Sequence, residues 1–142
     1  MVEHSGFHHV GVAVQSIKKA AVWYEKAGYK CSSTIEDQVQ KVRICWMSRD
    51  GAPLVELIEP TGNDSPVSSI LKRNGPGPYH TCYCVPDLGK AVAKLRQGGA
   101  LQLGRPVQAP AISGSSIVFM YSRDAGLFEL VEEPGIPAGF DS

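Results

Sequence analysis

The chain has 142 residues, about the length of one domain, and 43% of them are hydrophobic, which is enough to build a core. Lysine plus arginine and aspartate plus glutamate number 14 each, so the formal net charge is zero and argues against binding to nucleic acid or to an anionic membrane. No apolar run approaches the ~20 residues that span a bilayer, and the four cysteines, none in a C-x-x-C pair, indicate reduced thiols in a cytoplasmic protein.

The first half of the chain predicts one strand, one helix and three further strands. In FHHVGVAV, residues 7–14, valines alternate with His9, Gly11 and Ala13, as expected of a strand with two different faces. Ser16 is a suitable N-cap for the amphipathic helix that follows. The three further strands are expected near residues 31–36, 39–48 and 54–59.

The middle of the chain predicts a linker, and the second half predicts the same order of elements again. Within residues 61–78, Ser65-Pro66 begins a short helix and GPGP is too rich in proline and glycine for regular structure. A strand then starts at His80, and Asp87 caps a helix that ends at a pair of glycines. Strands are expected near residues 101–103, 117–121 and 127–132.

Phrases of sequence also recur between the halves. SRDGAPLVELIEP, residues 48–60, returns as SRDAGLFELVEEP, residues 122–134, and the segments that follow His9 and His80 share Lys-Ala and Gly at matching positions. Such self-similarity indicates an internal duplication, and two copies favour a closed unit with pseudo-twofold symmetry. We therefore predict an α+β fold in a single domain, 1–142, with module 1 at about 7–60, a linker at 61–78 and module 2 at about 79–134.

Each copy places one histidine early in its first strand and one glutamate in its last. The four residues are His9, Glu56, His80 and Glu129. Taken singly, a strand histidine is usually packed or on the surface, and a strand glutamate is usually solvated. The matched pair of both types favours one shared site instead. Two imidazoles and two carboxylates, without thiolates, suit one divalent ion of Zn, Ni, Co, Mn or Fe. A bound cation also offsets the cost of a glutamate in an apolar run.

Other polar residues nearby are assigned to structural roles. His8 is expected on the valine face of its strand, and it lacks a histidine counterpart in the second copy. Glu59 and Glu132 do repeat, but they lie on the other face from the paired glutamates and are expected to be solvated strand ends.

The sequences around the two histidines and the two glutamates resemble those of the vicinal oxygen chelate superfamily, which includes glyoxalases, methylmalonyl-CoA epimerases, extradiol dioxygenases and bleomycin-binding resistance proteins. HVGVAV resembles its first metal strand and VELIEP its second, which implies that His9 and Glu56 are ligands. DSPVSSILKRNGPGPYH resembles the epimerase linker that ends in a ligand histidine, and LFELVE resembles the last metal strand, which implies His80 and Glu129. The resemblance further implies tandem βαβββ modules that form a curled mixed sheet around a central cleft, and a homodimer.

The implied activity is that of a metal-dependent isomerase or epimerase, or of a glyoxalase-type lyase. Its substrate is a small carbonyl compound, such as a methylmalonyl-CoA-like acyl-CoA thioester, that loses a proton next to the carbonyl. In the glyoxalase branch a metal-bound glutamate is the base, which implies Glu129 or Glu56. In the epimerase branch separate carboxylates act, and the candidates are Glu36 and Asp37 in TIEDQVQKV. That stretch lacks the proline and glycine of the epimerases, and PAISGSSIVF stands in place of their Ala-His-Gly.

Two other functions remain open at this point. The first is a non-catalytic protein that sequesters an antibiotic or metabolite, although resistance proteins of that kind typically lack the metal residues. The second is an Fe(II) extradiol-type dioxygenase, which uses two histidines and one glutamate. The fourth ligand here argues against this second alternative.

Overall fold

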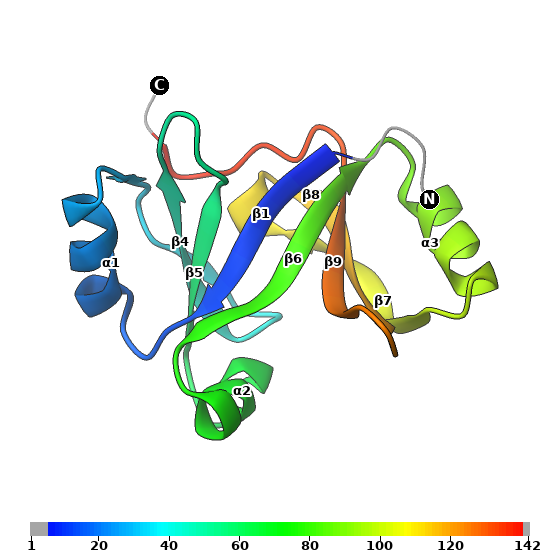
Figure 1. The fold of residues 1–142 in the computed structure, drawn as a ribbon, viewed down its shortest axis with the longest axis horizontal. Coiled ribbons are helices and arrows are strands. Elements are labelled where there is room, and N and C mark those ends of the chain that lie inside the picture. The colour runs from blue at the N-terminus through cyan, green and yellow to red at the C-terminus, as the bar shows by residue number, and fades with distance from the viewer. Residues whose placement is uncertain (1–5, 141–142) are drawn as a thin grey trace.

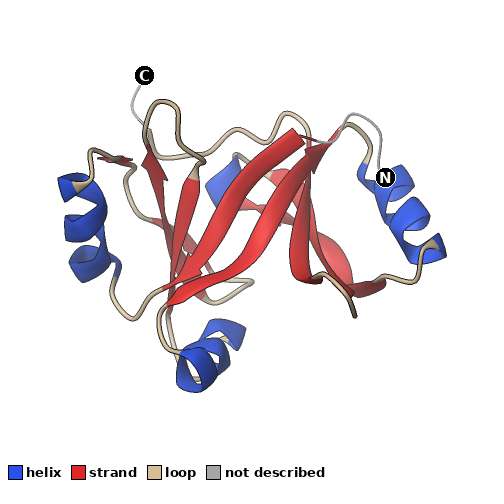
Figure 2. Ribbon diagram, in the orientation of Figure 1, coloured by secondary structure: helices blue, strands red, loops and turns tan. Residues whose placement is uncertain are grey.

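A mixed sheet of nine strands, curled but not closed, forms the centre of residues 6–140, the part of the chain that the computed structural model describes (Figures 1 and 2). The strand order is β2-β4-β5-β1-β6-β9-β8-β7, with β3 paired to β4. This arrangement confirms the predicted α+β class and the curled mixed sheet. The ends of the predicted domain, residues 1–5 and 141–142, lie outside the described residues.

The first module contains one helix. Its elements are β1 (Gly6–Ala13), α1 (Ile17–Lys26), β2 (Lys30–Cys31), β3 (Ile35–Asp37), β4 (Val42–Ser48) and β5 (Val55–Pro60). The helix α1 begins where predicted because the Ser16 hydroxyl accepts a hydrogen bond of 3.2 Å from the backbone N–H of Lys19.

The rest of the described chain holds the other two α-helices. Its elements are α2 (Pro66–Asn74), β6 (Gly77–Val85), α3 (Leu88–Gln97), β7 (Leu101–Ala109), the 3₁₀ helix η1 (Pro110–Ile112), β8 (Ser115–Ser122) and β9 (Gly126–Glu132). The predicted cap of α3 is present, since the Asp87 carboxylate accepts a bond of 3.0 Å from the Lys90 N–H. Within residues 6–140, no helix combines the length and the hydropathy needed to cross a bilayer.

Four strand predictions differ substantially from the structure in their bounds. The strand expected to start at His80 begins at Gly77, so the second half of GPGP belongs to β6 and not to an irregular linker. The strand expected at 31–36 is split into β2 and β3. The strand expected at 39–48 begins only at Val42, because Asp37 accepts hydrogen bonds from Gln40 in a turn that ends with Lys41 at a φ of 59°. The strand expected at 101–103 continues to Ala109 past an irregularity at Gly104, whose φ is 81°.

The two halves of the sheet are arranged alike around its centre. Strand β1 runs parallel to β5, β6 runs parallel to β9, and β1 and β6 pair antiparallel with each other in the middle. The helices α1 and α3 lie at opposite ends of the molecule, each on the outer face of its own half (Figure 1). The inner faces of both halves therefore line the same concave side of the sheet.

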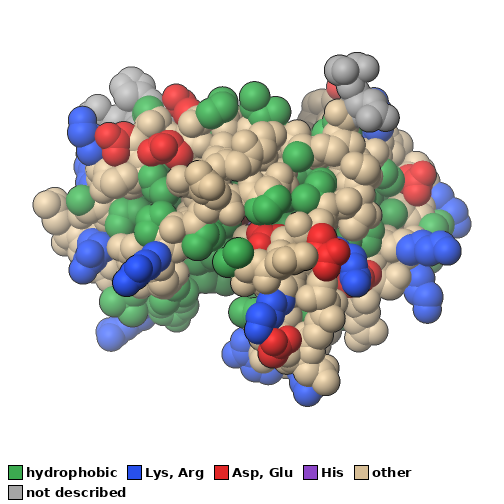
Figure 3. All heavy atoms as spheres, turned by 180° about the vertical axis from the view of Figure 1, so that it is seen from behind, with side chains coloured by type: hydrophobic (Ala, Val, Ile, Leu, Met, Phe, Trp, Pro, Cys, Tyr) green, Lys and Arg blue, Asp and Glu red, His purple; other side chains and the backbone are tan. Residues whose placement is uncertain are grey.

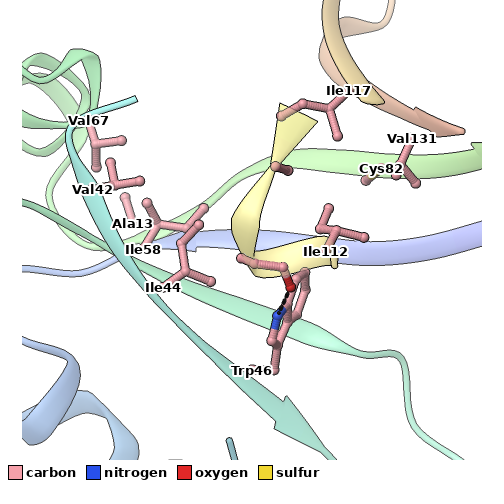
Figure 4. Packing of buried hydrophobic residues seen from close by; sticks show 12 residues of the cluster. Ala13, Val42, Ile44, Trp46, Ile58, Val67, Cys82, Ile112, Ile117 and Val131 are labelled. Atoms are coloured by element: carbon pink, nitrogen blue, oxygen red, sulfur yellow. Dashed lines mark hydrogen bonds between the residues drawn. The ribbon is translucent and has the colours of Figure 1, made fainter. Parts of the chain in front are cut away.

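Three clusters of buried side chains stabilise this arrangement. Val12 and Leu57 pack beneath α1, and Val85 and Leu130 pack beneath α3. The third cluster lies on the inner face and joins the two halves to η1 (Figure 4). There the fully buried Trp46 donates a hydrogen bond of 2.8 Å from Nε1 to the carbonyl of Ala111.

Glu59 and Glu132 are not solvated strand ends, so that prediction is wrong. Glu59 Oε1 accepts a hydrogen bond of 2.8 Å from the first N–H of α1, that of Ile17. Glu132 Oε2 does the same for α3, at 2.9 Å from the N–H of Leu88. A carboxylate at a helix N-terminus satisfies a free N–H group and complements the helix dipole. The repeated glutamates thus attach each helix to the last strand of its module.

Candidate metal centre

Four side chains from four strands converge at the middle of the inner face. His9 lies on β1, Glu56 on β5, His80 on β6 and Glu129 on β9, and their ligand atoms all lie within 4.8 Å of one another. The Nε2 atom of His9 is 3.3 Å from Glu56 Oε1 and 3.2 Å from Glu129 Oε1. The Nε2 atom of His80 lies 3.7 and 3.4 Å from the same two oxygens. The structure thus brings together the four residues that the sequence repeat singled out.

The strand register explains this convergence. Gly11 pairs with Glu56 on one side and with His80 on the other, so these three residues form one row across the sheet. Cys82 pairs with His9 and with Glu129 and forms a second row next to the first. In each row a small residue stands between a histidine and a glutamate, which leaves room for their side chains to lean inwards.

Gly11 is needed where it stands. A Cβ atom at this position would lie 2.0 Å from His80 Cε1 and 2.4 Å from His80 Nδ1, far inside van der Waals contact. The imidazole of His80 therefore lies directly over the backbone of Gly11. The small residues beside the two histidines are explained by this packing as well as by space for a ligand.

The four side chains are almost completely buried, and each exposes 4% or less of its surface. Burial alone would lower the pKa of His9, but the carboxylates of Glu56 and Glu129 outweigh it and raise this pKa to about 9. Burial alone would raise the pKa of Glu129, but its contacts with His80 and His9 outweigh burial and lower it. The cost of burying these imidazoles and carboxylates is therefore offset only if they share protons or a cation.

The geometry fits a divalent cation. Metal–ligand bonds of about 2.0–2.2 Å place neighbouring ligand atoms about 3.0–3.5 Å apart, and the distances from the His9 and His80 Nε2 atoms to the Glu129 oxygen, 3.2 and 3.4 Å, lie in this range. The two Nε2 atoms lie only 3.2 Å apart, as two lone pairs directed at one point would. Among the described residues, Glu129 Oε1 has no hydrogen-bond partner of acceptable geometry, although it is buried. A cation at the centre of the four ligands satisfies all of these atoms.

A second group of potential ligands overlaps the first. It consists of His8, His9 and Cys82. Burial raises the pKa of the Cys82 thiol far above its ordinary value, with the Glu129 and Glu56 carboxylates adding to the effect. Ionisation of this thiol is therefore costly, which favours the group that contains the two glutamates.

A cavity of about 470 Å³ opens above the cluster. Its floor includes Glu56, His80 and Glu129, and its walls are mainly apolar: Val42, Ile44, Ile58, Val67, Ile70, Ala111, Ile112, Ile117 and Phe119. The face opposite to that of Figure 1 shows hydrophobic side chains gathered across its middle and most lysines and arginines towards its rims (Figure 3). A few polar ligands at the base of an apolar pocket are typical of a small-molecule site.

Glu36 and Asp37 are not placed at this floor. Neither lines the cavity. Glu36 is exposed on β3, and the Asp37 carboxylate is occupied by hydrogen bonds of 2.9 and 2.7 Å from the backbone and side-chain nitrogens of Gln40. The structure therefore separates the two candidate bases of the epimerase branch from the four clustered residues.

Sequence reasoning missed the role of His8. The residue does not join the valines, because a bulge in β1 between Phe7 and His9 turns it towards His9 instead. The two Nδ1 atoms lie 2.7 Å apart, and His8 Nε2 lies 2.5 Å from the carbonyl oxygen of Gly135. The double histidine at positions 8 and 9 was the only signal for this contact, because strict alternation places the two rings on opposite faces.

Several known proteins are similar to this chain in sequence or in fold. Residues 8–119 match the Glyoxalase/Bleomycin resistance protein/Dioxygenase superfamily. The human mitochondrial methylmalonyl-CoA epimerase is 29% identical over 121 residues, which cover 84% of this chain and 68% of that protein. The structure of the methylmalonyl-CoA epimerase from Mycobacterium tuberculosis superposes with a TM-score of 0.82 at 28% identity, over 93% of this chain and 92% of that one. A variant of the Streptomyces coelicolor epimerase in complex with 2-nitronate-propionyl-CoA superposes with a TM-score of 0.79 at 26% identity, over 94% and 97% of the two chains.

Proposed function

The chain belongs to the glyoxalase/bleomycin resistance protein/dioxygenase superfamily, and within it we propose that the protein is a metal-dependent epimerase that removes and returns a proton next to a carbonyl. The observation that carries this proposal is the buried group of two histidines and two glutamates, of which Glu56, His80 and Glu129 line the floor of an apolar cavity. The similarity to methylmalonyl-CoA epimerases supports an acyl-CoA thioester as substrate.

His9, Glu56, His80 and Glu129 would hold the metal ion. A divalent cation in this place supplies Lewis-acid stabilisation of the negative charge that develops on the substrate oxygens as the proton leaves. The apolar walls exclude water and thereby strengthen every charge interaction at the floor. Two imidazoles and two carboxylates give a site of no net charge with a divalent ion, which leaves it open to an anionic substrate.

The base is best assigned to Glu129 or Glu56. Both carboxylates reach the floor of the cavity, whereas Glu36 and Asp37 do not line it. The two glutamates come from opposite halves of the sheet, on β9 and β5. A substrate bound over the ion would face one carboxylate from each half, so that one could remove the proton and the other return it, as inversion at a carbon requires.

The size and the rim of the cavity fit the acyl part of a thioester. A volume of about 470 Å³ is within the usual range for small-molecule pockets, and α2 contributes Pro66, Val67 and Ile70 to the wall. Lys72 and Arg73 lie in the last turn of the same helix. These cations are suited to the phosphates of a CoA group that extends beyond the rim.

The test is proton exchange with solvent. The protein is incubated in D₂O with methylmalonyl-CoA, other acyl-CoA thioesters and hemithioacetals, and NMR follows deuterium at the α-carbon. We expect exchange with a thioester that is lost in EDTA and restored by a divalent ion, and elemental analysis should find about one ion per chain. Exchange only with hemithioacetals would indicate a glyoxalase-type lyase, and tight binding without exchange would indicate a sequestering protein. Consumption of O₂ with a catechol would indicate a dioxygenase.

A matched pair of variants tests the base. Glu129→Gln should lower the exchange rate by about 10²–10⁴-fold, because it removes both a ligand and a candidate base. Glu36→Gln changes an exposed carboxylate on β3 in the same way and should leave the rate unchanged. The opposite result would move the base to β3. Size-exclusion chromatography tests the homodimer that the family resemblance implies.

A further inference from the structure

The bulge in β1 has a consequence for the metal centre. In the pairing of β1 with β6, Phe7 is opposite Tyr83 and His9 is opposite Cys82, so His8 is the extra residue between two consecutive pairs. A bulge of this kind commonly re-aims a side chain next to a functional site. Here it brings the imidazole of His8 against that of His9, with the ring centroids 4.9 Å apart.

The hydrogen bonds of His8 have only one consistent direction. The carbonyl oxygen of Gly135, 2.5 Å from His8 Nε2, can only accept, so His8 Nε2 carries the proton. A neutral His8 then offers a lone pair at Nδ1, which lies 2.7 Å from His9 Nδ1. His9 therefore donates from Nδ1, and once it has given up its second proton it keeps a lone pair at Nε2. That Nε2 is the atom that faces Glu56 and Glu129.

We propose that His8 is a positioning residue: by accepting a hydrogen bond from His9 Nδ1, it fixes the tautomer and the ring plane in which His9 Nε2 binds the metal. The proposal rests on the metal site of the proposed function, but it concerns the affinity for the metal ion and the tautomer of His9, not the rate of turnover. Metal-ligating histidines generally depend on such an acceptor for their other nitrogen.

The carbonyl of Gly135, which accepts the hydrogen bond from His8, is itself held in place. Gly135 has a φ of 63°, and its N–H donates a hydrogen bond of 3.2 Å to Ser115 Oγ at the start of β8. A Cβ atom at Gly135 would lie 3.2 Å from Cys84 Sγ and 3.3 Å from His8 Cδ2. The glycine thus lets the backbone approach the edge of the His8 ring.

The second metal histidine has no such partner. His80 Nδ1 is buried and has no hydrogen-bond partner among residues 6–140. Tyr79 stands before His80 as His8 stands before His9, but its ring packs against that of His80 at a centroid distance of 4.5 Å without a hydrogen bond to it. His9 is therefore the ligand whose orientation is set before metal binds, and His80 is held by packing over Gly11.

The experiment compares two substitutions of His8 by titration of the full chain with Zn²⁺. His8→Leu removes the acceptor and should raise the Kd for Zn²⁺ by about 10–100-fold. His8→Asn keeps an acceptor oxygen near the position of Nδ1 and should stay within about threefold of the unchanged protein. Phe7→Ala, on the same strand and 49% exposed, is the control for general disturbance of β1. Equal losses in the leucine and asparagine variants, or no loss in either, would overturn the proposal.

A second measurement keeps the proposal testable if the leucine variant does not fold. NMR of the unchanged, ¹⁵N-labelled protein should show a proton on His9 Nδ1 and a coupling across the hydrogen bond to His8 Nδ1. The zinc-loaded form is used at neutral pH, and the metal-free form near pH 10, above the pKa of about 9 that its neighbours give His9. A proton on Nε2 of His9 in the metal-free form, or no coupling in either form, contradicts the proposed role. If Zn²⁺ does not bind at all, the proposed function fails while this measurement still decides the role of His8.

Discussion

Gly11→Ala is the substitution whose effect the structure defines most narrowly. The new methyl group would lie 2.0 Å from His80 Cε1 and 2.5 Å from His80 Nε2. Carbon atoms in contact lie about 3.5–4.0 Å apart, so the imidazole has to move by roughly 1.5 Å. The backbone cannot yield instead, because Gly11 pairs with β5 on one side and with β6 on the other.

A shift of this size is large compared with the tolerance of a metal site. Ligand distances vary by only about 0.2 Å, so His80 could no longer act as the metal ligand that we propose. We expect the Kd for Zn²⁺ to rise by at least about 100-fold, which is about 2.7 kcal/mol. Forcing a methyl group into the packed inner face should also destabilise the metal-free protein by about 1–3 kcal/mol.

Calorimetric titration with Zn²⁺ and denaturant unfolding in EDTA measure the two effects separately. Gly6→Ala is the matched control, because a Cβ on Gly6 at the start of the same strand meets nothing within 4 Å. In Gly11→Ala/His80→Ala the methyl group no longer meets the ring, so stability should recover while Zn²⁺ binding stays weak. Unchanged Zn²⁺ affinity in Gly11→Ala would show that His80 does not coordinate from its place over this glycine.

Three further predictions concern the protonation of His9 and the buried hydrogen bond of Trp46. In EDTA, the interaction of protonated His9 with the glutamates should stabilise the fold fully below pH 6.5, the ordinary histidine pKa, and this stabilisation should be lost as the pH rises through about 9, because the folded-state pKa of His9 is raised. Thermal unfolding across this pH range measures the effect. A protein stability that rises with pH over this range would contradict the assignment. Affinity for Zn²⁺ should instead increase by about tenfold per pH unit up to about pH 9, since His9 must lose a proton to bind, and titrations at several pH values check the slope. Trp46→Phe should cost about 1–3 kcal/mol in urea unfolding, because it leaves the buried carbonyl of Ala111 without the partner it has at 2.8 Å, and a loss below 0.5 kcal/mol would mean that solvent reaches this group.

The repeat in the sequence was the strongest source of correct predictions. Ser16 and Asp87 cap α1 and α3 as expected, and the alternation around His9 assigned the inner and outer faces of β1. These features are local, or they repeat, so a single sequence displays them. The position of each module relative to the other followed only from the assumption of a pseudo-twofold axis, which the duplication suggested but did not prove.

The features that were missed depend on contacts between distant residues. The alternation rule placed His8 with the valines, and it failed because one extra residue in β1 has no partner in β6. The link from Glu59 to the first turn of α1 joins residues 42 positions apart, so its carboxylate looked like that of a solvated strand end. The turn chemistry of Asp37 was local but ambiguous, because a carboxylate that accepts hydrogen bonds in a turn cannot be told from a catalytic base by its residue type alone.

The duplicated halves are not equivalent at the centre, and the difference bears on how the site works. Cys82 stands in the second copy where Gly11 stands in the first, so only the first copy leaves the backbone bare for a ring to lie over it. Tyr79 likewise occupies the position in the second copy that His8 occupies in the first, and so, among residues 6–140, only His9 of the two histidines has a polar partner for its second nitrogen. One histidine is thus oriented by a hydrogen bond and the other by packing over Gly11. A hydrogen bond fixes which ring nitrogen carries the proton, whereas packing fixes only the position of the ring. We therefore expect loss of the His8 contact to alter the tautomer of His9, and substitution of Gly11 to displace the ring of His80. NMR of the two imidazole rings should distinguish these two effects.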